Sequence, residues 1–198
     1  MELINELQRL LSEYETQEKS VVFAKLDRDS KIATLGSTRP AIPPPTTACV
    51  LIGEVVYNLR AALDYLVFLL AAIDSGQLQE QTQFPIIDDE KDFSAQIKSR
   101  LKGVSSQHVA AIRSLQPFAG CAWTGELRDL SNPDKHRHLI AVAHRAEHVF
   151  RIKRTKDDFE TQFEPNVTTT FEDKRPVVET LRRLHSGVVK TLDDFASA

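Results

Sequence analysis

Hydrophobic and polar positions alternate with a helical period between Cys49 and Ile73. Along this stretch the apolar stripe steps by four and three residues in strict alternation, as one face of an α-helix does, through Ile52, Val56, Leu59, Leu63, Leu66, Leu70 and Ile73. At about 1.5 Å per residue, this helix would be roughly 37 Å long. Beyond Asp64 the second face is apolar as well. The pattern therefore predicts a central helix whose later half is buried on all sides.

The same periodicity predicts further helices in the chain. They cover residues 2–18, residues 88–101, a stretch capped by Ser105 or Ser106 and ended by Pro117, a short stretch through residues 127–130, and the end of the chain from Pro176 onward. Residues 118–125, which include Trp123, are predicted to form a loop.

Other segments alternate with the period of two that is typical of β-strands. These are a hairpin within residues 20–35, a long strand over residues 139–153, and two shorter strands over residues 158–163 and 167–171. The predicted fold is α+β: a helix-dominant bundle around a long central helix, with a small antiparallel β-sheet. At 198 residues the chain is predicted to be a single domain, divided into an N-terminal helix and hairpin (1–45), a helical core (46–138), and strands with a C-terminal helix (139–198).

Composition and charge narrow the classes of protein to consider. A net charge of -3 and a pI of about 6.1 argue against a surface devoted to nucleic acid. Two cysteines without a CxxC spacing and the absence of an apolar leader favour a reduced, cytoplasmic protein. The apolar run at 61–73 is too short to cross a bilayer, so no membrane partner is expected. One helix that is apolar on nearly every side favours a homodimer.

The early turns of the central helix carry a polar face. It is formed by Tyr57, Asn58, Arg60 and Asp64, away from the apolar stripe. Arg60 and Asp64 are four residues apart, a spacing at which opposite charges meet on a helix. This face is either an ordinary solvated surface with one ion pair, or a buried polar network in which each group needs a partner.

A second polar cluster covers residues 132–138, where a helical region is expected to turn into a strand. His136 could act as a general base or acid near neutral pH, and Asp134 could orient its imidazole. Lys135 and Arg137 could hold a phosphate or carboxylate group, and Asn132 precedes them. The alternative is a solvated turn, which the Asn-Pro-Asp sequence favours.

Signatures of metal and cofactor sites are absent from the sequence. His136 and His138 would share a face in a strand, as would His144 and His148, but no HExxH, CxxC or Glu-x-x-His pattern accompanies them. No Gly-rich phosphate loop and no GxSxG motif occur. We therefore expect no metal and no cofactor. The segments TQFP (82–85) and LQPF (115–118) each place an aromatic residue beside a proline and are predicted to be structural anchors.

Four blocks together resemble a family of uncharacterised bacterial proteins. The blocks are IGEVVYNLRAALDYL (52–66), TQFPI (82–86), LQPF (115–118) and NPDKHR (132–137), in the same order. The resemblance is clearest over residues 46–140. The resemblance implies a shared fold unit and a shared site, but it does not indicate which reaction, if any, the site performs.

A looser resemblance is to HEPN domains, helical modules of bacterial toxin and defence systems. Some of these are metal-independent ribonucleases in which an arginine is followed on a helix by a histidine after four to six residues. Arg137 and His144 fit this spacing but fall where a strand is predicted, and Arg128 and His136 are one residue too far apart.

Two hypotheses follow from the sequence. In the first, the protein is a binding module or HEPN-like RNA-processing protein that takes RNA or a small anionic ligand between the central helix and residues 132–138. His136, Arg60 and Lys135 would be catalytic, and Tyr57, Asn58, Asp64, Asn132, Asp134 and Arg137 would bind. In the second, the protein is not an enzyme, and the same polar residues form a buried network that stabilises the fold.

Overall fold

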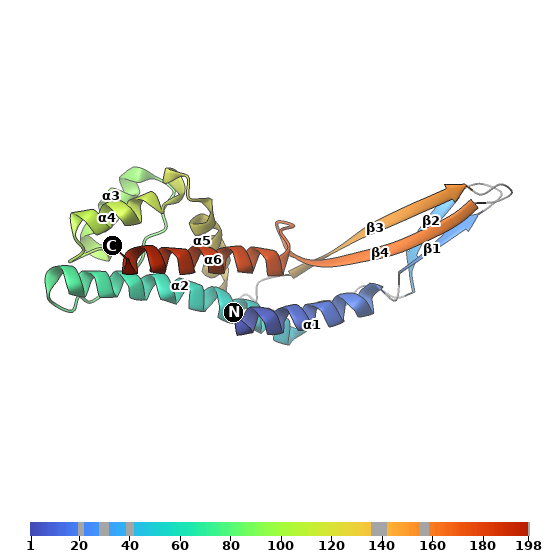
Figure 1. Cartoon of the computed structure of the whole chain (residues 1–198), viewed down its shortest axis with the longest axis horizontal. Helices are drawn as coiled ribbons and strands as arrows, with labels where there is room; N and C mark the ends of the chain where they lie inside the picture. Colours follow the sequence, from blue (N-terminus) through green and yellow to red (C-terminus); the bar gives the residue numbers. More distant parts are fainter. Residues whose placement is uncertain (20–21, 28–31, 39–41, 136–141, 155–158, 198) are drawn as a thin grey trace. The chain divides into compact units, whose positions relative to one another are not determined.

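A computed structural model describes residues 1–19, 22–27, 32–38, 42–135, 142–154 and 159–197 of the chain (Figure 1). The elements are α1 (Glu2–Lys19), β1 (Val22–Asp27), β2 (Ile32–Ser37), α2 (Thr46–Ser75), α3 (Glu90–Arg100), α4 (Ser106–Ser114), a 3₁₀ turn η1 (Pro117–Ala119), α5 (Ala122–Lys135), β3 (Val142–Arg154), β4 (Phe159–Phe171) and α6 (Val177–Ala196). Helices dominate and all strands pair antiparallel, which confirms the helix-dominant α+β class in its broad form.

The chain groups into two compact units. The first contains residues 52–140 and 179–198 together with Met1, and the second contains residues 2–51 and 141–178. The single domain predicted from the sequence stays a prediction.

The second unit carries the strands. β1 pairs with β2, so the predicted hairpin is confirmed, and β3 pairs with β4 over their whole length. β4 is one continuous strand, so the prediction of two strands at 158–163 and 167–171 is wrong. Pro165 lies within β4 although it lacks an N–H, because each strand of a two-stranded ladder has an edge where no donor is needed. The Glu15 carboxylate of α1 accepts hydrogen bonds from the backbone N–H and the hydroxyl of Thr169 at 2.7 and 2.8 Å.

The first unit is built on the larger part of α2. Six of the seven residues in its predicted stripe are buried: Ile52, Val56, Leu59, Leu63, Leu66 and Leu70. Ile73, the seventh, is 74% exposed, and Tyr65 and Leu69 are 68% and 55% exposed. The prediction that the later half of this helix is buried on all sides is therefore wrong, because no described segment covers that face.

Shorter helices follow α2 in the same unit. Ser105 caps α4 through a hydrogen bond from the His108 N–H, as the sequence predicted, and Asp89 caps α3. Trp123, by contrast, was predicted to lie in a loop but belongs to α5. Its ring lies against Gly187 of α6. The absence of a side chain at that position lets the two helices approach closely.

Replacing Gly187 with alanine is expected to destabilise the protein, although alanine is the better helix former. A Cβ at this position would lie 2.8 Å from Cδ2 and 2.9 Å from Cε2 of Trp123, closer than packed atoms can come. We expect a loss of about 1–2 kcal/mol, because overpacking costs about 1–3 kcal/mol and helix propensity returns up to about 1 kcal/mol. Urea unfolding measures the effect. Ser186→Ala is the control, and the loss should disappear in a Trp123→Leu background.

Candidate functional site

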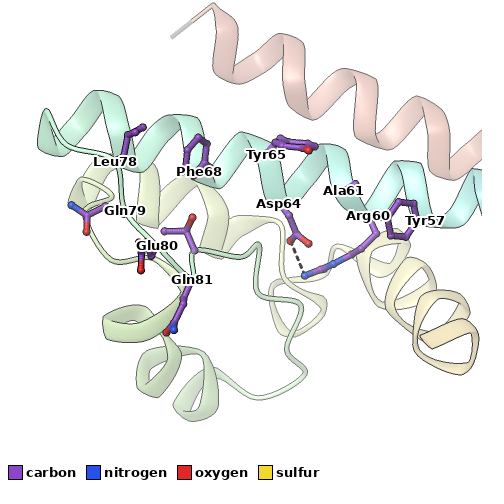
Figure 2. A pocket seen from close by; sticks show the side chains of 11 residues that line it. Tyr57, Arg60, Ala61, Asp64, Tyr65, Phe68, Leu78, Gln79, Glu80 and Gln81 are labelled. Atoms are coloured by element: carbon purple, nitrogen blue, oxygen red, sulfur yellow. Dashed lines mark hydrogen bonds and ion pairs between the residues drawn. The ribbon is translucent and has the colours of Figure 1, made fainter. Parts of the chain in front are cut away.

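Arg60 and Asp64 form the ion pair that their spacing predicts (Figure 2). Both side chains also bind the backbone of Phe84. Arg60 Nη2 lies 3.0 Å from Asp64 Oδ1 and donates a second hydrogen bond to the Phe84 carbonyl. Asp64 Oδ1 accepts a hydrogen bond of 2.9 Å from the Phe84 N–H. The two side chains thus satisfy both polar backbone groups of one buried residue, and we call this arrangement the Phe84 clamp.

The clamp supplies the backbone hydrogen bonds that a neighbouring strand would otherwise provide. Residues 82–87 have no assigned helix or strand, yet Phe84, Pro85 and Ile86 are buried. Buried backbone N–H and carbonyl groups require hydrogen bonds, and α2 provides them through side chains on successive turns. The side chain of Arg60 is 9% exposed and that of Asp64 is 31% exposed. Arg60 is thus buried and Asp64 partly exposed, and both side chains have hydrogen-bond partners.

A second buried polar residue holds the same segment from the other end. Gln116 is completely buried; its Oε1 accepts a hydrogen bond from the Ile87 N–H at 3.0 Å, and its Nε2 donates to the Ile112 carbonyl at 3.0 Å. Phe118 packs edge-to-face on Phe93, with ring centroids 5.7 Å apart. The predicted anchors at 82–85 and 115–118 are therefore confirmed as parts of one core.

On one side of the clamp is a small cavity of about 240 Å³ that we call the arginine pocket. Its lining combines three arginines with amide and hydroxyl groups, and consists of Arg60, Gln83, Ile86, Arg100, Arg128, Ser131 and Asn132. Arg128 pairs with Asp88 at 2.6 Å and with Asp129 at 2.8 Å. None of the acidic residues that the structure describes forms an ion pair with Arg100.

Burial and neighbouring charges shift the pKa values of Arg60 and Arg128. Burial lowers the pKa of the Arg60 guanidinium, Asp64 opposes this, and the positive charge of Arg100 lowers it further. The hydrogen bond to Asp88 is the main cause that raises the pKa of Arg128. Arg60 and Arg100 are thus close enough to repel each other, and an anion placed between them would relieve this repulsion.

A larger hollow of about 660 Å³ lies on another side of Arg60. Figure 2 shows side chains of α2 and of the following loop around it, and its lining consists of Tyr57, Arg60, Ala61, Asp64, Tyr65, Phe68, Leu78, Gln79, Glu80, Gln81 and Thr82. Five of these eleven residues are apolar or aromatic, whereas the arginine pocket has one apolar residue, Ile86.

The structure brings together two of the residues predicted for the site and separates others. Arg60 and Asn132, from the two polar clusters, line the arginine pocket. Arg60 also lines the larger hollow, together with Tyr57 and Asp64. Asn58 is exposed and lines neither.

The second cluster is only partly within the described residues. Asn132 to Lys135 form the last turn of α5, so the prediction of a turn is wrong for these four positions, since Pro133 is accommodated within a helix. Asp134 and Lys135 are described only in their backbone, and His136 and Arg137 lie outside the described residues. His144 belongs to β3, as predicted, which removes it from the helical context of the HEPN spacing.

Two groups of residues in this unit were not predicted as site residues. Arg100 and Arg128 complete the arginine pocket, but each also resembles an ordinary helix-surface cation in the sequence. Asp74 and His108 form a partly buried pair, with His108 Nδ1 2.7 Å from Asp74 Oδ2. Asp74 also accepts a hydrogen bond from the Ser105 N–H at 2.8 Å and so joins α2 to the start of α4. No group of three or more His, Cys, Asp or Glu side chains among the described residues could hold a metal ion.

The Asp74 pair is expected to make stability depend on acid pH. Burial would raise the pKa of the Asp74 carboxyl, but hydrogen bonds from Ser105 and His108 outweigh it and lower the pKa below the ordinary 3.8. A lowered folded-state pKa favours the folded protein above pH 3.8, and this contribution disappears as the pH falls through the folded-state value. Asp74→Asn should therefore cost about 1–2 kcal/mol at neutral pH and much less near pH 3. Denaturant unfolding at both pH values measures this; an equal cost at both would contradict it.

Comparison of the chain with protein-family models, with curated proteins and with solved structures finds no match.

Proposed function

We propose that this chain is a binding module whose arginine pocket takes a small anionic ligand through a phosphate or carboxylate group. The guanidinium group offers a planar fork of donors that matches the oxygens of such anions. The observation that carries the proposal is the convergence of Arg60, Arg100 and Arg128 on one cavity. The finer part of the predicted fold, a bundle of long helices around α2 and a small antiparallel sheet, is likewise a proposal.

The balance of charge identifies Arg100 as the principal anion-binding group. Asp64 neutralises Arg60, and Asp88 and Asp129 neutralise Arg128. Arg100 has no such partner among the described acidic residues, so its charge is left for a ligand. A volume of about 240 Å³ is below the ordinary range for drug-sized ligands and suits one phosphate or carboxylate group.

The proposal includes one macromolecular ligand, RNA, whose phosphate groups are anions of the required kind. Its backbone phosphate would occupy the arginine pocket, with Lys135, His136 and Arg137 following Asn132 in the chain. In a HEPN-like reaction His136 would be the general base and the cations would stabilise the developing negative charge. Varied RNAs left intact by the wild-type protein would contradict cleavage and leave the binding of small anions to be judged separately.

A structural role is the second candidate, and the Phe84 clamp favours it. On this view Arg60, Asp64, Asn132, Asp134 and His136 stabilise the fold of a non-enzymatic interaction protein. The two candidate functions make different predictions for Arg100, which is not part of the Phe84 clamp. Arg100 would bind the ligand in the first candidate and would not stabilise the fold in the second.

Replacing Arg100 with alanine is expected to weaken anion binding by about 10- to 100-fold, because a hydrogen bond to a charged group contributes about 1.5–3 kcal/mol. Calorimetric titration of the full chain with inorganic phosphate measures the binding. The melting temperature should stay unchanged, since Arg100 forms no ion pair with a described residue.

Lys98→Ala is the matched control, because Lys98 is an exposed cation of the same helix that does not line the pocket. Equal phosphate affinity in the wild type, Arg100→Ala and Lys98→Ala would overturn the anion site. A fall in melting temperature for Arg100→Ala without a change in affinity would mean that Arg100 stabilises the fold, and would count against the anion site.

A further inference from the structure

The larger hollow beside Arg60 has a notch at Ala61. Tyr57 and Tyr65 lie one helical turn before and one turn after Ala61 on α2, so two aromatic rings flank the smallest side chain of the lining. At about 1.5 Å per residue, the two tyrosines are roughly 12 Å apart along the helix axis. Tyr57 is 65% exposed and Tyr65 68% exposed, so both rings are available to a ligand that lies over Ala61.

The hollow also contains a carboxylate oxygen that no described residue uses. Asp64 accepts hydrogen bonds from Arg60 and from the Phe84 N–H, and both are accepted by Oδ1. Asp64 Oδ2 accepts none from the residues that the structure describes, and the side chain is 31% exposed. Asp64 follows Ala61 by three residues, a spacing that makes the two side chains neighbours on the helix surface. The carboxylate therefore borders the notch.

The charges around the hollow favour a cation. Arg60 is the one cation of the lining, and Asp64 neutralises it. Glu80 also lines the hollow, is exposed, and forms no ion pair with a described residue. Figure 2 shows Glu80 on the loop that follows α2, on the same side of the helix as Asp64. Glu80 therefore leaves an excess of negative charge, and the faces of the two tyrosine rings attract cations as well.

We propose that the larger hollow binds a small organic amine in its protonated form. The ammonium group would donate a hydrogen bond to Asp64 Oδ2, and the apolar body of the ligand would lie over Ala61 between Tyr57 and Tyr65. The volume of about 660 Å³ is within the range of roughly 300–1,000 Å³ that is usual for small-molecule sites. This site and the arginine pocket take ligands of opposite charge, and neither proposal depends on the other.

A neutral apolar molecule is the competing occupant of the hollow. By length and composition α2 could cross a membrane, a criterion that core helices also meet, and 44% of its apolar window is buried. A neutral apolar group over Ala61 would remove water from Asp64 Oδ2 without replacing its hydrogen bonds, which is unfavourable for a carboxylate. An ammonium group supplies a hydrogen bond at the same place, so the amine is favoured over a neutral molecule of the same shape.

Calorimetric titration of the full chain with phenethylamine, which is protonated at neutral pH, tests the site. We expect a dissociation constant of about 1 mM or lower, as is reached by ligands of this size. Phenethyl alcohol has the same aromatic body but carries a hydroxyl group in place of the ammonium group. The alcohol should bind about 10-fold more weakly or worse, because it lacks the charge that strengthens a hydrogen bond to a carboxylate.

Two variants test the position of the amine. Ala61→Leu fills the notch and should weaken phenethylamine binding by about 10-fold or more, since the ligand body loses its space. Glu80→Gln keeps the shape of an exposed side chain but removes its charge, and should weaken binding by about 2- to 5-fold. Ala95→Leu, at an exposed position of α3 that does not line the hollow, is the matched control for Ala61→Leu and should bind like the wild type.

Circular dichroism shows whether Ala61→Leu is folded, and Glu80→Gln tests the site independently because position 80 is exposed. Equal affinities of the wild type for phenethylamine and phenethyl alcohol would overturn the amine site and leave an apolar hollow. Absence of phenethylamine binding to the wild type at millimolar concentration would overturn it as well. So would an unchanged affinity in a folded Ala61→Leu variant or in Glu80→Gln.

Discussion

Replacing Asp64 with alanine is expected to lower the free energy of unfolding by about 2–4 kcal/mol. The change leaves the buried Arg60 guanidinium without its carboxylate, and removal of one partner from a buried ion pair costs about 3–5 kcal/mol. It also removes the acceptor of the Phe84 N–H. The partial exposure of Asp64 reduces the expected cost below the upper end of that range. For a chain of this length, the melting temperature should fall by about 4–16 °C.

Two variants separate the parts of this effect. Asp64→Asn keeps an oxygen that can accept the Phe84 N–H but removes the charge, so it should lose less stability than Asp64→Ala. Glu54→Ala, at an exposed position on the same helix, should lie within about 0.5 kcal/mol of the wild type. An unchanged melting temperature for Asp64→Ala would argue against the clamp as a stabilising device. An increase would instead favour a functional role, because active sites often give up stability for activity.

The helices were largely predictable because their signals are local. In α2 and α6 the spacing of the apolar residues alone determines which face is buried, and the structure buries that face from Ile52 to Leu70 and from Val177 to Val188. The i, i+4 pairing of Arg60 with Asp64 is equally local. The same reasoning failed at Tyr65 and Leu69, because side-chain hydrophobicity shows what would be buried if a segment were available to cover it, and none of the described segments does so.

The arginine pocket was only half predictable. Arg60 and Asn132 stood out because they belong to dense polar clusters, and the structure places both at this cavity. Arg100 lies in the last turn of α3, where a basic residue is favoured by the helix dipole whatever its function. Because the helix dipole already explains a basic residue at this position, the sequence gives no sign that Arg100 also takes part in a site with residues far away in the chain. The role of Phe84 in joining Arg60 to Asp64 was likewise invisible, since the clamp uses its backbone rather than its side chain.

Replacing Phe84 with alanine is expected to cost about 3–5 kcal/mol. The side chain is completely buried, and removal of a buried aromatic ring loses its transfer free energy and leaves a cavity. Phe84→Leu fills most of this space and should cost less than half as much. Both values come from urea or guanidinium unfolding monitored by far-UV circular dichroism.

The combination of Phe84→Ala with Asp64→Ala shows whether the ring and the clamp act on the same segment. If residues 82–87 detach once the ring is lost, the hydrogen bonds of the clamp no longer stabilise the fold. The loss of unfolding free energy in the double variant should then be about 1 kcal/mol smaller than the sum of the losses in the two single variants. Val189→Ala, at an exposed position of α6, should instead add to Phe84→Ala within about 0.5 kcal/mol. Strict additivity of Phe84→Ala and Asp64→Ala would mean that the segment stays in place without its ring. The backbone hydrogen bonds of Phe84 to Arg60 and Asp64 would then be sufficient to hold it.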